Sequence, residues 1–205
     1  MPRNVDHAER RAEIVLGLWG VIHERGLEGV TFRAVAESAG VSVGRIQHYF
    51  ASKDELVREG CTRIVAAARK GHESRTAHSG AAPSLRDLVA SPIPRSESER
   101  LGAAVWYAYL ARSASDPRIA EIVAAALEDS RRRAARLVEE LRGPRRPEHP
   151  EADPGEARRG ELEQEALTLL AVGEGLAQRT TLGTLAVEDA LLVVDEELAR
   201  RGLTP

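Results

Sequence analysis

Cysteine and aromatic residues are scarce in this sequence. Cys61 is the only cysteine among 205 residues, so a disulfide within one chain is impossible. Aromatic residues make up only 3% of the chain, although 42% of its residues are hydrophobic. A hydrophobic core must therefore be built mainly from leucine, valine and alanine. Alanine, leucine, arginine and glutamate are abundant, and this composition favours helix.

Long apolar segments and the sequence motifs of enzymes are also missing. No hydrophobic run is long enough to cross a bilayer, and the first residues do not resemble a signal segment, so we expect a cytoplasmic protein. The six histidines are scattered, and neither H-E-x-x-H, a nucleotide-binding glycine loop nor G-x-S-x-G is present. Cys61 falls within a predicted helix and is interpreted as a small buried hydrophobe instead of a nucleophile. We therefore expect no enzyme, no catalytic residue, no metal and no cofactor.

The chain has little net charge, −3 at pH 7. Its first 53 residues contain seven Arg and Lys against six Asp and Glu. A protein that coats nucleic acid without regard to sequence is far more basic than this. Any affinity for DNA must therefore come from the placement of a few charges and from two subunits acting together.

The most informative segment spans residues 31–53 and predicts a helix-turn-helix. Thr31 is a polar cap before a run whose apolar residues repeat at helical spacing. Gly40 ends that run where the backbone needs a left-handed conformation. Ser42 then caps a second short helix over residues 43–49, again with apolar residues at helical spacing. Two short helices joined in this way leave one side of the second helix available for DNA.

The order of residues in this segment resembles the DNA-binding domain of TetR-family transcriptional regulators. The matching segments are AEIVLGLWGVIHERGLEGVTF, AESAGVSVGRIQHYF and SKDELV, and three helices with both turns fit without a gap. The sequence departs from the family pattern at Gln47, where relatives usually carry an aromatic residue. It also departs at Gly17 and Gly20, where each glycine costs about 1 kcal/mol of helix propensity relative to alanine. The first helix must therefore be stabilised by packing.

We expect an all-α fold with two domains. Residues 1–53 would form a three-helix, helix-turn-helix DNA-binding domain, and residues 54–205 a helical ligand-binding and dimerisation domain. The stretch GPRRPEHPEADPG contains four prolines, which interrupt a helix, and it predicts a flexible linker over residues 143–160. About nine helices are expected, over residues 6–25, 32–39, 43–49, 53–70, 85–90, 97–113, 117–141, 161–179 and 187–201.

The polar side chains of the motif suit contacts to DNA. Arg45 can pair with guanine and Gln47 with adenine in the major groove, each with about 1–3 kcal/mol of discrimination. Hydroxyl, guanidinium, phenol and ammonium groups near helix ends suit phosphates. The expected base contacts are Val43, Gly44, Arg45, Gln47 and His48, although His48 alternatively contacts a phosphate or lies on the solvated side. The expected phosphate contacts are Thr31, Arg33, Tyr49 and Lys53, and the resemblance implies that Tyr49 and Lys53 clamp phosphates.

Two terminal helices carry more apolar surface than one small core needs, which predicts a dimer. The segments AVWYAYLARSASDPRIAEIV and ALTLLAVGEGLAQRTTL are similar to the ligand-binding and dimerisation region of a large TetR subgroup. The resemblance implies that the last two helices of each chain pair as a four-helix bundle. Alternatively, both helices only complete the core of the monomer. The expected dimer interface consists of Leu167, Leu170, Ala171, Gly175, Leu176, Leu191, Val194 and Leu198.

The resemblance implies a pocket for a small molecule between the fourth and eighth helices, and a concentration of aromatic residues in one helix offers candidates to line it. Trp106, Tyr107 and Tyr109 are three of the seven Trp, Tyr and Phe residues, and at helical spacing they cannot all face one way. Any single one of them is alternatively a core residue. Arginines 131–133 are interpreted as a solvated face, or alternatively as part of an anion site. The expected pocket residues are Trp106, Tyr107, Tyr109, Leu110 and Leu170.

The leading hypothesis is a dimeric, sequence-specific transcriptional regulator. It would be a repressor that a small, largely apolar ligand releases from a pseudo-palindromic operator. Its partners would be double-stranded operator DNA, a small-molecule effector and a second copy of the chain, with no membrane. The alternative is an activator of the same fold, or a regulator controlled by a partner protein. An enzyme or scaffold built on a helical bundle would leave the helix-turn-helix unexplained.

Overall fold

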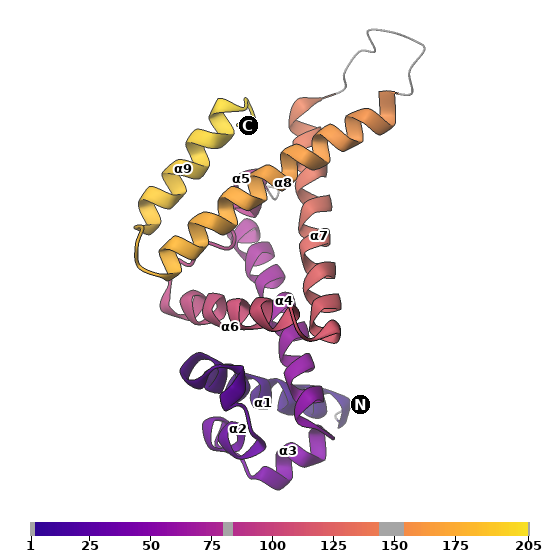
Figure 1. The fold of residues 1–205 in the computed structure, drawn as a ribbon, viewed down its shortest axis with the longest axis vertical. Helices are drawn as coiled ribbons and strands as arrows, with labels where there is room; N and C mark the ends of the chain where they lie inside the picture. Colours follow the sequence, from indigo (N-terminus) through magenta and orange to yellow (C-terminus); the bar gives the residue numbers. More distant parts are fainter. Residues whose placement is uncertain (1–2, 80–83, 144–153, 205) are drawn as a thin grey trace. The chain divides into compact units, whose positions relative to one another are not determined.

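The expected all-α fold is confirmed in a computed structural model that describes residues 3–79, 84–143 and 154–204 (Figure 1). Within these residues every regular element is helical, and no strand is present. The elements are α1 (Arg3–Arg25), η1 (Leu27–Gly29), α2 (Phe32–Ala39), α3 (Val43–Tyr49), α4 (Lys53–Ser79), α5 (Leu85–Val89), α6 (Glu97–Ser113), α7 (Pro117–Arg142), α8 (Pro154–Thr181) and α9 (Val187–Arg200).

α4 and α8 are each longer than the sequence predicts by about two helical turns. α4 continues to Ser79 instead of ending near residue 70, and α8 begins at Pro154. Residues 154–160 are therefore helical, and the prediction of a flexible linker over them is wrong. The reason is that proline is accommodated in the first turn of a helix, where its missing N–H has no intrahelical partner to lose. Residues 144–153 lie outside the described part of the chain.

The chain divides into two compact units. Unit 1 comprises Met1–Ala68 and Leu101–Ala124, and unit 2 comprises Arg69–Arg100 and Ala125–Pro205. The helix-turn-helix falls inside unit 1, together with the first turns of α4 and parts of α6 and α7. The predicted functional boundary after residue 53 remains a prediction, because packing units and functional domains need not coincide.

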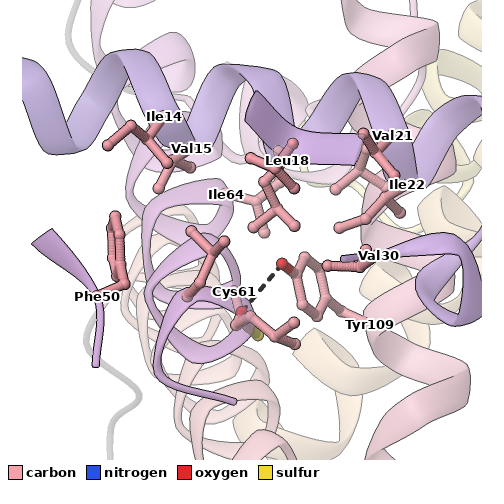
Figure 2. Close-up of a cluster of buried hydrophobic side chains, with 14 of the residues drawn as sticks. Ile14, Val15, Leu18, Val21, Ile22, Val30, Phe50, Cys61, Ile64 and Tyr109 are labelled. Carbon is pink, nitrogen blue, oxygen red and sulfur yellow. Dashed lines mark hydrogen bonds between the residues drawn. The ribbon is translucent and has the colours of Figure 1, made fainter. Parts of the chain in front are cut away.

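Aliphatic side chains from several helices form the core of unit 1 (Figure 2). Leu18, Ile46 and Leu56 are each fully buried, and they come from α1, α3 and α4. Tyr109 of α6 is also fully buried, and its hydroxyl donates a hydrogen bond to the Val57 carbonyl at 3.0 Å. α3 is therefore anchored on the same core as α1 and α4.

α1 and α2 cross closely, because glycines of α1 face the end of α2. A Cβ atom on Gly17 would lie 2.6 Å from the Ala39 Cβ and 2.8 Å from the Ala39 nitrogen. A Cβ atom on Gly20 would lie 2.9 Å from the Ser38 hydroxyl oxygen. The two glycines that weaken the intrinsic helix propensity of α1 thus allow the contact that positions α2. The close packing agrees with the expectation that packing stabilises the first helix, which remains a prediction.

Unit 2 has its own core, built around α5, α8 and α9. Leu169 and Val194 are buried on facing sides of α8 and α9, and Leu88 of α5 belongs to the same cluster. Arg86 of α5 donates to both carboxylate oxygens of Asp195 in α9, at 2.5 and 2.8 Å. These hydrogen bonds from Arg86 hold the pKa of Asp195 below its usual range.

Candidate nucleic-acid interface

The caps that the sequence predicts for the helix-turn-helix are present. The Thr31 hydroxyl oxygen accepts a hydrogen bond from the Ala34 N–H at 3.0 Å, at the start of α2. The Ser42 hydroxyl oxygen accepts one from the Arg45 N–H at 3.2 Å, at the start of α3. Each cap provides a partner for a backbone N–H that the helix itself leaves unpaired. The two helix starts are thus fixed by local chemistry.

The turn between the two helices depends on Gly40. Its φ and ψ are 64° and 32°, the left-handed conformation that other residues adopt only at a cost. The next residue closes the end of α2, because the Val41 N–H donates to the Ala36 carbonyl at 2.9 Å. This combination of a left-handed residue and a backward hydrogen bond is a common helix ending. The predicted role of Gly40 is confirmed.

α3 is anchored on one side and exposed on the other. Ile46 is fully buried, and only 1% of Phe50, which follows the helix, is exposed. All five residues predicted to contact bases are exposed, and Val43 at 38% is the apolar one among them. A rigid helix with an outward polar face is the geometry that major-groove recognition requires. The base contacts themselves remain a prediction for Val43, Gly44, Arg45, Gln47 and His48.

The residues predicted to contact phosphates lie around this face. Thr31, Arg33 and Lys53 are exposed, whereas Tyr49 is half-buried. The Thr31 oxygen accepts the capping hydrogen bond, which leaves its O–H as the donor for a phosphate. Tyr49 stands between two imidazoles, with ring centroids 4.7 Å from His7 and 5.1 Å from His48. The phosphate contacts also remain a prediction.

Lys53 opens α4 at a well-formed helix start. The Glu55 N–H donates to the Ser52 hydroxyl oxygen at 3.1 Å, which is one of the two hydrogen bonds of a capping box. The Glu55 carboxylate does not accept from the backbone of Ser52 but from the Ala51 N–H one residue earlier, at 2.8 Å. Both hydrogen bonds hold the turn between α3 and α4, so the ammonium group of Lys53 is placed at the positive end of a helix, where phosphate binding is favoured.

Arg11 of α1 also belongs to this region, although the sequence did not predict it. Its guanidinium donates to the Tyr49 carbonyl at 2.6 Å and to the Glu55 carboxylate at 3.3 Å. It also contacts Glu59 at 3.4 Å and lies 4.1 Å from the centre of the Phe50 ring. No local sequence pattern predicts these contacts, because Tyr49 and Glu55 lie 38 and 44 residues further along the chain.

Part of the predicted dimer interface is already buried within one chain. Leu170, Val194 and Leu198 are 8%, 1% and 2% exposed and belong to the core of unit 2. An apolar stripe on an amphipathic helix faces the core of its own chain first, and these three residues form that stripe. Leu176 and Leu191 are half-buried against the same core. Of the predicted set, Leu167, Ala171 and Gly175 are exposed.

Two further aliphatic side chains are exposed on α9. Leu192 is 56% exposed and Val193 is 40% exposed, while Leu167 on α8 is 49% exposed. Leu192 and Val193 directly follow Leu191, the residue that was predicted to lie in the dimer interface. Helical spacing alone distinguishes these neighbours, since a one-residue step on a helix rotates the side chain by about 100° and turns it to a different face.

The predicted pocket residues differ in burial and come from both units. Trp106 and Tyr107 are half-buried, and Leu110 is 39% exposed. Tyr109 is a core residue of unit 1, where burial raises the pKa of its hydroxyl above the ordinary range. Leu170 belongs to the core of unit 2. An open hollow of about 580 Å³ in unit 2 lies elsewhere and is lined by Gly160, Glu161, Gln164, Glu165, Thr168 and Arg201.

Other features of the described residues bear on function less directly. Cys61 is fully buried, and burial raises the pKa of its thiol to about 11, which agrees with its interpretation as a small hydrophobe. Arg131 of the arginine run pairs with Glu128 at 2.9 Å and Glu163 at 2.6 Å. Among the side chains described, no group of three or more His, Cys, Asp and Glu is arranged to hold a metal ion. None of the described helices is long and apolar enough to span a membrane.

Comparison with known proteins points to one family. The family profile described as "Bacterial regulatory proteins, tetR family" matches residues 17–59. The HTH-type transcriptional regulator PksA of Bacillus subtilis is 47% identical over 57 residues, which are 28% of this chain and 28% of the relative. The HTH-type transcriptional regulator BetI of Burkholderia cenocepacia is 30% identical over 130 residues, 58% of this chain and 62% of the relative. The chain thus spans less than two thirds of the length of these relatives.

Solved structures extend the likeness over most of the chain. A transcriptional regulator from Rhodococcus sp. RHA1 superposes with a TM-score of 0.74 at 25% identity, over 95% of this chain and 99% of that one. A regulator from Saccharomonospora viridis in complex with choline gives a TM-score of 0.74 at 21% identity, over 94% of this chain and 96% of that one. At 21% identity the second comparison shows a shared fold alone.

Proposed function

This chain belongs to the TetR family of bacterial regulatory proteins, and we propose that it is a sequence-specific DNA-binding transcriptional regulator that acts as a homodimer. The observation that carries the proposal is the exposed polar face of α3 on a helix whose opposite side is buried. Such a helix presents the same side chains in the same place to every DNA site, which sequence discrimination requires. The relatives named above are regulators. Binding to DNA would place the protein in the cytoplasm.

Within this proposal Arg45 and Gln47 carry most of the discrimination. Both are exposed and lie in the first half and middle of α3, where a recognition helix approaches base edges. A guanidinium matches the two acceptors of guanine, and a carboxamide matches the donor and acceptor of adenine. Because relatives usually carry an aromatic residue at the position of Gln47, the preferred operator would differ from theirs.

Dimerisation is proposed through the exposed faces of α8 and α9. Leu167, Ala171 and Gly175 lie on the exposed side of α8, and Leu192 and Val193 on that of α9. Small residues at 171 and 175 allow another helix to approach closely, and the aliphatic residues supply the area to be buried. A two-fold pairing of these faces would form a four-helix bundle and place two recognition helices about one DNA turn, ~34 Å, apart.

We further propose that the protein is a repressor released by a small, largely apolar ligand, with Trp106 and Tyr107 as the aromatic groups that contact it. Release requires that the ligand bind the DNA-free conformation more tightly than the DNA-bound one. Aromatic side chains also suit a quaternary ammonium ion such as choline, which is bound in the structure of the Saccharomonospora regulator. Activation of transcription, or control by a partner protein, is the alternative.

Selection of bound fragments from a random DNA library tests the proposed function. The full chain is expected to enrich one pseudo-palindromic motif, and added ligand is expected to reduce binding to it. The ligand panel contains apolar metabolites and choline in separate arms. Enrichment without release by any ligand would leave the DNA-binding proposal intact and favour control by a partner protein. No enrichment would overturn the function itself.

Substitutions in α3 and α4 are expected to separate sequence recognition from general affinity. Arg45→Ala and Gln47→Ala remove base contacts, so each should lower the preference for the enriched fragment over a scrambled one by roughly tenfold. Lys53→Ala removes a phosphate contact and should weaken binding to both fragments by a similar factor. Fluorescence anisotropy titrations at one salt concentration measure both affinities. Equal losses on both fragments for all three variants would contradict this division of roles.

A further inference from the structure

Arg11 connects three segments of unit 1. It lies in α1, and its guanidinium reaches the carbonyl at the end of α3 and the carboxylates of Glu55 and Glu59 on α4. Its side chain is only 20% exposed, and it covers the face of the Phe50 ring. A guanidinium has five donors in a fixed fork, which lets one side chain hold several acceptors at once. These contacts join α1 to α3 and α4, and the proposed function requires these helices to keep a fixed arrangement.

The contact to Tyr49 fixes the carbonyl end of the recognition helix. α3 ends at Tyr49, whose carbonyl has no partner within the helix. A positive charge at this end is also favoured by the helix dipole. A helix of seven residues has little stability of its own, so its orientation depends on what holds its two ends. Ser42 holds one end, and Arg11 holds the other.

The contacts to Glu55 and Glu59 tie the same end to α4. These carboxylates are four residues apart and therefore lie on one face of the helix. Glu59 also accepts a hydrogen bond from Arg63 at 2.6 Å. Burial raises the pKa of Glu59, but the hydrogen bond from Arg63 and the charges of Arg11 and Arg63 outweigh it and lower that pKa. Glu59 is thus held as a carboxylate, and the ionic chain from α1 to α4 is continuous.

His7 strengthens the same connection from α1. It precedes Arg11 by four residues, one helical turn, so both side chains leave α1 on the same side. Its ring lies 4.7 Å from that of Tyr49, centroid to centroid. The side chain and the carbonyl of Tyr49 are therefore both contacted from α1.

We infer that Arg11 is a positioning residue that sets the orientation of the recognition helix and couples it to the first turns of α4. This inference rests on the proposed function, since orientation matters only if α3 reads DNA. Any displacement of α4 relative to α1 would stretch the Arg11 contacts and move the end of α3, a few residues from Gln47. Arg11 itself need not touch DNA.

The test compares Arg11→Met with Arg10→Met in the full chain. Each variant loses one positive charge from α1, but Arg10 pairs with Glu13 at 2.8 Å on the exposed surface. Both are titrated with the fragment that the unmodified protein enriches and with a scrambled fragment. Arg11→Met is expected to lower the ratio of the two affinities by about tenfold, whereas Arg10→Met should leave the ratio unchanged. Arg11→Lys keeps the positive charge but lacks the forked guanidinium, so its affinity ratio should lie between those of Arg11→Met and the unmodified protein.

The outcomes separate the inference from the function on which it rests. If the unmodified protein enriches no fragment, the proposed function fails and the inference fails with it. If it discriminates and Arg11→Met discriminates equally well, the inference alone is wrong. Thermal unfolding curves show whether each variant is folded at the temperature of the titration. If Arg11→Met is unfolded there, Arg11→Lys takes its place, and an unchanged ratio for that variant then overturns the inference.

Discussion

Gly17→Ala is expected to lower the free energy of unfolding by about 1–3 kcal/mol, although alanine is the better helix former by about 1 kcal/mol. The added methyl group would lie 2.6 Å from the Ala39 Cβ and 2.9 Å from its Cα. Ala39 ends α2, and the atoms that would be too close include backbone, so the strain cannot be relieved by a change of rotamer. α2 would have to move away from α1. Denaturant titration at a fixed protein concentration measures the change.

Gly102→Ala is the matched control. Gly102 lies inside α6, and a Cβ atom there would meet nothing within 4 Å. The same substitution should therefore stabilise the protein by up to about 1 kcal/mol, through helix propensity alone. The two variants are expected to shift the unfolding midpoint in opposite directions. A midpoint that rises for both would show that the close approach of α1 and α2 is not a constraint.

Leu192→Asp is expected to dissociate the proposed dimer without unfolding the chain. Leu192 is 56% exposed in one chain, so a carboxylate there is tolerated while the face stays in water. In a paired bundle the carboxylate would lose its hydration without gaining a partner, which is costly. Affinity for an operator with two half-sites should fall by about 100-fold or more. A monomer contacts only one half-site, so the second contact no longer adds to the affinity of the same complex. Light scattering gives the mass, and titration with the enriched DNA gives the affinity.

Val194→Asp is expected to behave differently, because Val194 is only 1% exposed and packs inside unit 2. A charge at that position should cost about 3 kcal/mol or more of stability and reduce the helical signal in circular dichroism. Together the two variants test the proposed interface. If Leu192→Asp stays dimeric while Val194→Asp gives a folded monomer, the buried stripe forms the dimer and the proposed interface is wrong.

The helix-turn-helix was predictable because its determinants are local. Thr31, Gly40 and Ser42 each act on backbone groups within a few residues, and their contacts agree with the prediction. The order of residues, through its resemblance to the family, predicts the same helix-turn-helix. The exposed side of α3 then follows from helical spacing, since burial of Ile46 fixes which residues face outward.

Features that depend on distant contacts were not predictable in the same way. The apolar stripe of α9 was correctly recognised, but its periodicity does not say whether Val194 faces its own core or a second chain. The start of α8 at Pro154 was not predicted, because proline interrupts the interior of a helix but is accommodated in its first turn. Arg11 has no local signature, since its partners lie far along the sequence.

The central claim is that two recognition helices, one from each chain, contact a single DNA site together. It is tested most directly by inserting about five base pairs, half a turn of DNA, between the half-sites of the enriched fragment. The insertion is expected to reduce affinity nearly to that for scrambled DNA, because the second helix then faces the wrong side of the duplex. Undiminished affinity for the fragment with the insertion would contradict it.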